Sequence, residues 1–152
     1  MTRRRKIIDP PPSQQNLAPE GVRTSMRPAA RRDANVLVVD DELVIREVLR
    51  DFLEARGFRV ASAASGAEAL LWLQRNRPGV VLLDIFMPDG NGLEVLRELK
   101  RTKPGPSVLV ISGYVDEELR QRVRALGAVE CVAKPFDIYK LHALIAERIP
   151  SH

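Results

Sequence analysis

Several apolar runs in this chain end in polar side chains of types that suit chemistry on a phosphate group. An acidic pair follows residues 36–39, an acid follows 80–83, a hydroxyl follows 108–111 and a lysine follows 129–133. Each run has the length of a buried strand, and the carboxyl ends of parallel strands meet at one edge of a sheet, where open α/β sheets bind ligands. We therefore expect one site there, built from Asp40, Asp41, Asp84, Ser112 and Lys134.

Three carboxylates brought that close cannot all stay ionised without a compensating cation. Lys134 can supply one positive charge. Oxygen ligands without His or Cys also suit a hard ion such as Mg²⁺, which takes one or two carboxylates together with a phosphate oxygen. The chemistry that fits is phosphoryl transfer, with Asp84 as the nucleophile and an aspartyl phosphate as the product. Taken alone, Asp84 would more simply cap the turn that follows it.

The elements that must position these side chains alternate along the chain. Strands are predicted at 36–39, 58–61, 80–83, 108–111 and 129–133, and a helical pattern follows each of them. This alternation is typical of successive right-handed βαβ units and hence of a parallel sheet. It predicts an α/β fold, a flavodoxin-like doubly wound sheet of five parallel strands with five helices, and by analogy the strand order 2-1-3-4-5.

Apolar residues at helical spacing define the buried stripes that we expect on the five helices. Ser65 with Glu68 predicts a capping box before the second helix, and Asp137 is the predicted N-cap of the last helix. The predicted stripes are Ile45, Val48, Leu49, Phe52 and Leu53; Ala67, Leu70 and Leu71; Leu93, Leu96 and Leu99; Leu119, Val123 and Leu126; and Ile138, Leu141, Leu144 and Ile145.

The composition indicates a single folded domain of a cytoplasmic protein without membrane insertion. The chain has 152 residues, of which 45% are hydrophobic and 29% charged, enough for one domain with a core of its own. No apolar stretch approaches the ~20 residues that span a bilayer, and the N-terminus lacks the apolar segment of a signal peptide. Cys131 is the only cysteine, which excludes an intrachain disulfide and a thiolate metal cage.

The positive charge is concentrated at the N-terminus. Residues 1–34 hold eight basic and three acidic residues, whereas the remaining chain holds sixteen basic and seventeen acidic residues. Five prolines and little apolar periodicity predict a disordered tail over 1–34, followed by a folded domain over 35–150. Clustered arginines attract phosphates, so a nucleic-acid-associated regulator acting through the tail is an alternative function. Without interleaved aromatic residues as a stacking platform, nucleic acid is not the expected partner.

The combined motifs resemble the receiver domain of bacterial two-component response regulators, over residues 35 to about 150. They are Asp40-Asp41, Asp84 with Met87-Pro88 and Gly92, Ser112-Gly113, and Lys134-Pro135-Phe136. The resemblance implies that Asp84 accepts a phosphoryl group from a sensor histidine kinase or a histidine phosphotransfer protein. It implies that Mg²⁺ is bound by Asp41, Asp84 and the Phe86 backbone carbonyl, with Asp40 helping through water. It further implies that Lys134 pairs with the phosphoryl group, that Ser112 is the switch hydroxyl, and that Pro135 follows a cis peptide bond.

The expected function is that of a single-domain response regulator in a phosphorelay, because nothing foldable follows residue 150. Its chemistry would be limited to Mg²⁺-dependent self-phosphorylation and autodephosphorylation, and its output would be a change in the binding of a downstream protein partner or a phosphorylation-linked homodimer. One departure concerns Cys131, which stands where most such domains have an aromatic switch residue. Either Tyr114 substitutes for it in part, or the output change is smaller. An aspartate-nucleophile phosphatase is a further alternative, but it normally needs a second aspartate where Phe86 stands.

Overall fold

The computed structural model describes residues 34–149. The predicted tail over 1–34 therefore lies outside the described residues except for Ala34, which is buried. No helix in the described part of the chain is long and apolar enough to cross a membrane.

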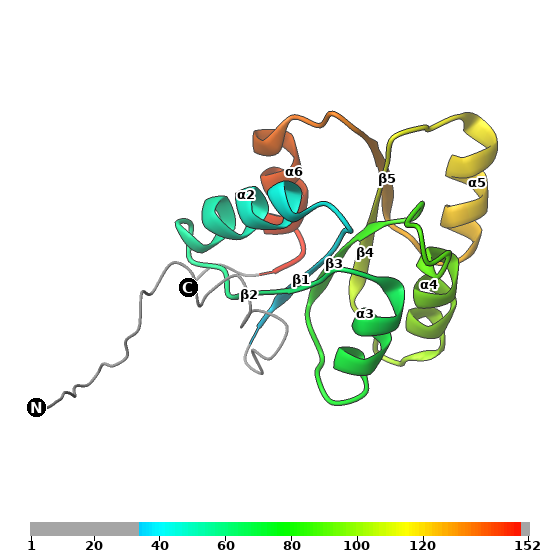
Figure 1. The fold of residues 1–152 in the computed structure, drawn as a ribbon, viewed down its shortest axis with the longest axis horizontal. Coiled ribbons are helices and arrows are strands. Elements are labelled where there is room, and N and C mark those ends of the chain that lie inside the picture. The colour runs from blue at the N-terminus through cyan, green and yellow to red at the C-terminus, as the bar shows by residue number, and fades with distance from the viewer. Residues whose placement is uncertain (1–33, 150–152) are drawn as a thin grey trace, which may run out of the picture.

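A single sheet of five parallel strands forms the centre of the fold, in the order β2-β1-β3-β4-β5 (Figure 1). The predicted class, strand count and order are therefore confirmed. The three central strands consist almost wholly of aliphatic residues buried from both sides, which is the pattern of a sheet covered on two faces. The strands are β1 (Val36–Val39), β2 (Val60–Ala63), β3 (Val80–Asp84), β4 (Ser107–Ser112) and β5 (Glu130–Ala133).

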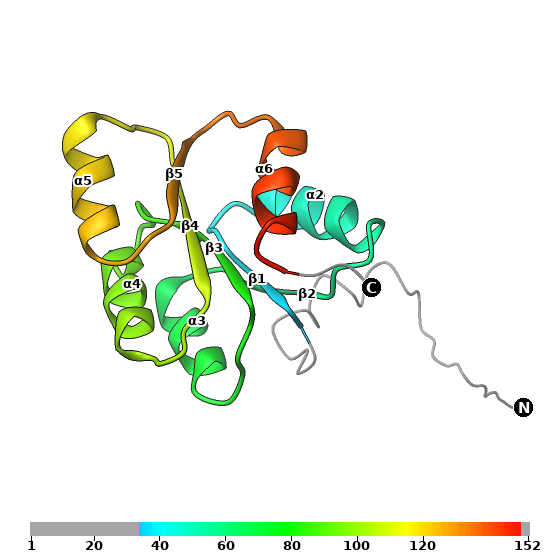
Figure 2. The same cartoon turned by 180° about the vertical axis from the view of Figure 1, so that it is seen from behind.

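Within residues 34–149, five helices cover the two faces of the sheet (Figures 1 and 2). Leu49 and Leu53 of one helix and Leu141 and Ile145 of another join one core cluster, while three further helices join the cluster on the opposite face. The helices of the first face are α2 (Leu43–Glu54) and α6 (Ile138–Ala146), and those of the second are α3 (Gly66–Leu73), α4 (Gly92–Arg101) and α5 (Glu117–Ala125).

Acidic and hydroxyl side chains fix where three helices begin. Ser65 Oγ accepts from the Glu68 N–H at 3.1 Å, as predicted, while the Glu68 carboxylate accepts from the N–H of Ala64. Asp137 Oδ1 accepts from two backbone N–H groups of α6, and Asp116 accepts from the Leu119 N–H at 2.8 Å. These caps satisfy N–H groups that have no partner inside a helix, and they set where each loop that leaves a strand enters the following helix.

Three details of the predicted pattern are wrong. The second strand is Val60–Ala63 rather than 58–61, because the backbone N–H of Phe58 is still bonded to the end of α2, at Leu53 O. On α3 the buried positions are Gly66, Ala69 and Trp72, whereas Leu71 is 66% exposed. Six of the eight residues of this helix are apolar, so their period does not single out one face. Val48, at the margin of the α2 stripe, is also exposed.

Candidate active site

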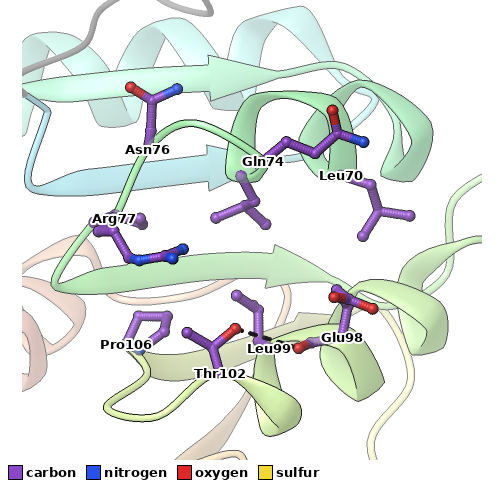
Figure 3. A pocket seen from close by; sticks show the side chains of 10 residues that line it. Leu70, Gln74, Asn76, Arg77, Glu98, Leu99, Thr102 and Pro106 are labelled. Atoms are coloured by element: carbon purple, nitrogen blue, oxygen red, sulfur yellow. Dashed lines mark hydrogen bonds between the residues drawn. The ribbon is translucent and has the colours of Figure 1, made fainter.

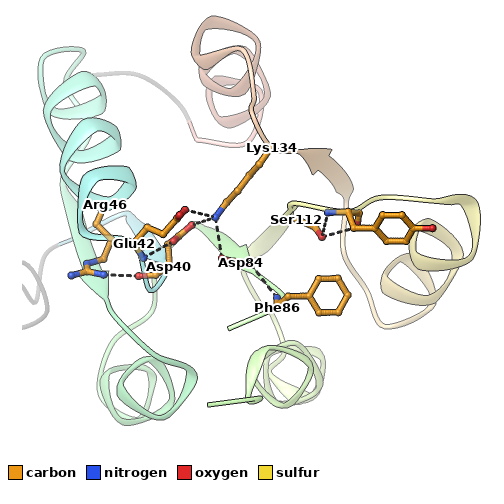
Figure 4. Close-up of polar contacts among 8 residues, drawn as sticks. Asp40, Glu42, Arg46, Asp84, Phe86, Ser112 and Lys134 are labelled. Atoms are coloured by element: carbon orange, nitrogen blue, oxygen red, sulfur yellow. Dashed lines mark hydrogen bonds and ion pairs between the residues drawn. The ribbon is translucent and has the colours of Figure 1, made fainter. Parts of the chain in front are cut away.

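Asp84 ends β3, the middle strand of the sheet, with β1 on one side and β4 on the other. Asp40 follows the end of β1, and its backbone N–H donates to Ala63 O, which holds it at the same edge. Lys134 follows β5, and its backbone N–H donates to Ser112 O at 2.7 Å. Parallel strands therefore deliver residues distant in sequence to one edge, as the sequence predicted (Figure 4).

Three carboxylates meet at this edge. Asp40, Asp41 and Asp84 each offer an oxygen, and these oxygens lie within 4.8 Å of one another. The Asp40 and Asp84 side chains are only 2% and 5% exposed, whereas Asp41 is exposed. Ionised groups so little hydrated and so close repel each other strongly, so the cluster needs cations.

Lys134 supplies the cation inside the described part of the site. Its Nζ lies 2.8 Å from Asp40 Oδ2, 3.0 Å from Asp84 Oδ2 and 3.0 Å from Glu42 Oε1 (Figure 4). Burial alone would lower the pKa of Lys134, but its close contacts with the three carboxylates outweigh burial and raise the pKa above its ordinary value. The ammonium group is therefore firmly protonated and holds two buried acids together.

Burial is the largest influence on Asp84 and raises its pKa above the ordinary value for an aspartate. The charge of Asp40 acts in the same direction. The hydrogen bond from Lys134 and a 3.1 Å bond from the Phe86 N–H to Oδ1 oppose this shift without cancelling it. One carboxylate oxygen is thus held by Lys134 and the other by a backbone N–H, which fixes the plane of the group.

The donor set fits a divalent cation. Asp40 Oδ2 is buried and has no hydrogen bond, because its 2.8 Å contact with Lys134 is an ion pair without hydrogen-bond angles. Carboxylate oxygens from three side chains, one of them exposed, suit Mg²⁺, which prefers oxygen ligands and keeps several waters. The exposed Asp41 carboxylate lies on the side of this cluster that faces solvent.

Ser112 lies at the same edge but outside this network. It is fully buried, its Oγ donates to Tyr114 O at 2.7 Å, and it accepts from the Tyr114 N–H at 3.1 Å. The structure thus brings Asp40, Asp41, Asp84 and Lys134 together, while the Ser112 hydroxyl is bonded to its own loop. The Lys134–Pro135 peptide bond is cis, as the resemblance implied.

The sequence reasoning missed Glu42. This residue directly precedes α2, its backbone N–H donates to Asp40 Oδ1 at 2.8 Å, and its carboxylate pairs with Lys134. The signal was present as a third consecutive acid after the first strand. A glutamate next to a helix start is also what the helix dipole favours, so the sequence alone does not single out Glu42 as part of the site.

Arg120 lies at the surface next to Cys131, the residue that stands in place of the usual aromatic switch side chain. Cys131 is buried, and Arg120 Nη1 donates to its carbonyl oxygen at 3.0 Å while lying 3.9 Å from Glu130. Tyr114 and Phe86 are 67% and 59% exposed. Phe86 stands where the phosphatase alternative needs an acid, and only its backbone N–H reaches Asp84.

Comparison with known proteins gives one family. The response regulator receiver domain matches residues 36–146. Sporulation initiation phosphotransferase F of Bacillus subtilis is 32% identical over 115 residues, which are 76% of this chain and 93% of that protein. Several other curated relatives are longer, and the chain spans about half of their length.

Solved structures give the same result. The chemotaxis protein CheY4 of Vibrio cholerae has a TM-score of 0.70 and 30% identity, over 76% of this chain and 98% of that chain. A response regulator from Burkholderia pseudomallei, solved with a phosphorylated aspartic acid, a calcium ion and citrate, has a TM-score of 0.68 and 27% identity. The alignment covers 78% of this chain and 68% of that one.

Proposed function

Because this chain belongs to the response regulator receiver family of two-component signalling, we propose that Asp84 accepts a phosphoryl group and that the resulting aspartyl phosphate switches the binding of a partner. The observation that supports this most directly is the Asp40, Asp41 and Asp84 cluster with Lys134 Nζ 3.0 Å from Asp84. The structure of a relative, the Burkholderia pseudomallei response regulator, contains a phosphorylated aspartic acid and a calcium ion. The donor would be the phosphohistidine of a sensor kinase or a phosphotransfer protein.

In the proposed reaction an Asp84 oxygen attacks phosphorus. The new P–O bond forms as the P–N bond of the donor histidine breaks, and the departing imidazole nitrogen takes up a proton. The Phe86 N–H keeps the Asp84 carboxylate oriented during this transfer, and the Lys134 ammonium lies where it can pair with the incoming phosphoryl oxygens. The chain then acts only on itself, by self-phosphorylation and autodephosphorylation.

Asp41, Asp84 and the Phe86 carbonyl would hold a Mg²⁺ ion, with Asp40 acting through water. Bound there, the ion would neutralise charge on the phosphoryl oxygens and the carboxylates. The Asp84 side chain is only 5% exposed, so a donor has to approach along exposed Asp41. A 560 Å³ hollow lined by Asp41, Phe86 and Met87 lies on that side.

Ser112 would report the phosphoryl group to the surface. Its hydroxyl must give up the 2.7 Å bond to Tyr114 O in order to donate to a phosphoryl oxygen. A hydrogen bond to a charged group contributes about 1.5–3 kcal/mol, whereas inverting a 1:99 equilibrium takes about 5.5 kcal/mol. Lys134 therefore has to change partners as well, and its 3.0 Å contact with exposed Glu42 is the one most easily released.

The output surface would be formed by α5, β5 and α6, next to the Ser112 and Lys134 loops. A 640 Å³ groove there is lined by Arg120, Cys131 and Phe136, among others. With Cys131 at the switch position, movement of Arg120 from its bond to Cys131 O would replace the rotation of an aromatic ring. A downstream protein or a second copy of the chain would bind this surface. The change in this binding would be the output of a single-domain regulator.

The decisive experiment is incubation with acetyl phosphate and Mg²⁺, followed by intact-mass measurement. We expect one added phosphoryl group in the natural chain and none in Asp84→Asn. Asp51→Asn, on the exposed side of α2, is the matched control and should be labelled normally. Equal labelling of Asp84→Asn, or no labelling of the natural chain in Mg²⁺, would exclude the assignment.

A further inference from the structure

Another cavity lies at the opposite edge of the sheet from the phosphorylation site, where the strands begin. Its volume is about 490 Å³, and it is formed by the last turn of α3, the turn before β3, the last turn of α4 and the turn before β4 (Figure 3). This is the size of a small-molecule site and far more than one water requires. None of the residues assigned to phosphoryl transfer lines it.

The cavity has apolar walls on two sides. Leu70 and Leu73 come from α3, and Leu99 with Pro106 comes from the α4 side (Figure 3). Leu99 is buried, while Leu70 and Leu73 are half-buried and pack against the same core. Two facing walls of aliphatic side chains form a slot, which accepts a flat ring better than a branched or highly hydrated molecule.

The polar groups of the slot favour an anion. The Arg77 guanidinium and the Gln74 side-chain amide both line it, and neither has a hydrogen-bond or ion-pair partner among residues 34–149. Glu98 also lines it but is paired with Arg101 at 2.8 Å, so its charge is already compensated. Arg77 presents several N–H donors in a planar fork that matches phosphate.

The surroundings of the slot are strongly basic. The segments at this edge are 54–59, 74–79, 100–106, 122–130 and 147–149; they hold ten basic and three acidic residues, a formal charge of +7. The segments at the phosphorylation edge are 40–43, 64–68, 84–94, 112–118 and 134–138, which hold one basic and eleven acidic residues, or −10. The near-neutral total of the folded domain therefore conceals two poles.

Helix dipoles explain part of this separation, because bases at helix C-termini and acids at N-termini are stabilising. They do not account for Arg75, Arg77 and Lys103, which lie beyond the last residues of their helices, at Leu73 and Arg101. A field of this sign draws phosphate-bearing ligands towards the slot.

We propose that the slot between α3 and α4 binds a nucleotide, with the base between the two apolar walls, its edge against Gln74, and a phosphate on Arg77. The nucleotide could be free or part of a single-stranded nucleic acid, since both present the same base and phosphate. The inference does not depend on phosphorylation of Asp84.

The test is isothermal titration of the full chain with AMP, GMP and a 5′-phosphorylated single-stranded tetranucleotide. Variants are Arg77→Gln, which removes the phosphate contact, and Leu70→Trp, which fills the slot. Arg124→Gln is the control: it makes the same charge change at the same edge, on an exposed residue outside the slot. Thermal unfolding verifies that each variant is folded, and NMR of the Gln74 side-chain amide reports occupancy.

We expect saturable binding that Arg77→Gln weakens at least tenfold, that Leu70→Trp abolishes and that Arg124→Gln leaves within twofold. Tighter binding of the tetranucleotide than of both mononucleotides assigns the slot to nucleic acid, and the reverse assigns it to a free nucleotide. Equal weakening in Arg77→Gln and Arg124→Gln would show attraction to the whole basic edge and would overturn the site, as would the absence of saturable binding. Acetyl phosphate labelling of Asp84 in the same samples is an independent measurement. Failure of the nucleotide site and failure of the proposed phosphorylation can therefore be told apart.

Discussion

Lys134 neutralises two buried carboxylates at once, and the remaining imbalance sets how the protein responds to pH. Its own raised pKa contributes stability that is present below the ordinary lysine pKa of about 10.4 and is lost as pH rises through the folded value. Asp84 changes stability in the same direction, but over a lower pH interval. Because its pKa is raised by burial, the native state holds a proton more tightly than the unfolded chain, and stability falls as pH rises through that interval.

Replacing Asp84 with asparagine should therefore stabilise the metal-free protein at pH 7. Asparagine carries no charge to bury, and Lys134 keeps its contacts with Asp40 and Glu42. The gain should shrink as pH falls towards the ordinary aspartate pKa of about 3.9, because the natural carboxyl is then protonated as well. Urea unfolding of both proteins in EDTA, between pH 3.5 and 8, measures this difference. A variant less stable than the natural chain at pH 7 would show that the Asp84–Lys134 pair outweighs the burial of the charge.

Phe86 and Tyr114 should lengthen the life of the aspartyl phosphate. Both side chains are largely exposed, and the backbones of the two residues bond to Asp84 and Ser112 respectively, so their rings can hinder an attacking water without contacting Asp84. Phe86→Ala with Tyr114→Ala should raise the hydrolysis rate roughly tenfold, which corresponds to about 1.4 kcal/mol of activation free energy. Loss of phosphoryl mass after removal of the donor gives the rate. Hydrolysis of the natural chain within seconds, or an unchanged rate in the double variant, would contradict this role.

At the scale of elements, the β3–α4 loop holds Asp84 against the sheet through close backbone contact. A Cβ on Gly92 would lie 2.3 Å from the carbonyl oxygen of Ile85, so only glycine fits between this loop and the start of α4. Gly92→Ala should cost about 1–3 kcal/mol of unfolding free energy and slow phosphorylation, because the loop that orients Asp84 has to move.

Gly113→Ala is the matched control for this change. It lies in the Ser112 loop, and a Cβ there would meet nothing within 4 Å. Chemical denaturation and acetyl phosphate labelling of both variants separate a packing effect from a general intolerance of loop substitutions. Equal losses in the two variants would contradict the steric account.

Much of the element pattern could be predicted because the strands are short and almost purely aliphatic. The runs 36–39 and 80–83 could be interpreted only as buried strands, and the polar residues after them marked one edge of the sheet. The buried face of α3 could not be predicted, since its contacts depend on Trp72 and on the close approach of Gly66 to Asn91. Glu42 was missed for a related reason: its role depends on Lys134, 92 positions away.

At the scale of the whole molecule, the sheet separates two charged edges that the total charge does not reveal. All five strands run parallel and every helix returns antiparallel to them, so helix starts gather at one edge and helix ends at the other. The acids at the first edge suit cation binding and phosphoryl transfer. The basic residues at the second edge attract the phosphate of another molecule. The net charge of the whole domain therefore does not show which partners each edge can bind.

Deleting residues 1–33 should leave the folded domain intact. β1 is paired on both sides, with β2 and β3, and Asn35 O accepts from the backbone N–H groups of Gly79 and Val80, so the retained chain closes the sheet by itself. We expect the unfolding free energy to change by less than about 1 kcal/mol and Asp84 labelling to persist. Nucleotide binding in the α3–α4 slot should also persist, with a shallower salt dependence once eight basic residues are gone. Calorimetry of the full and shortened chains at several salt concentrations measures stability and nucleotide binding, and intact mass measures the labelling. Binding lost with the tail would move the anion site from the slot to residues 1–33.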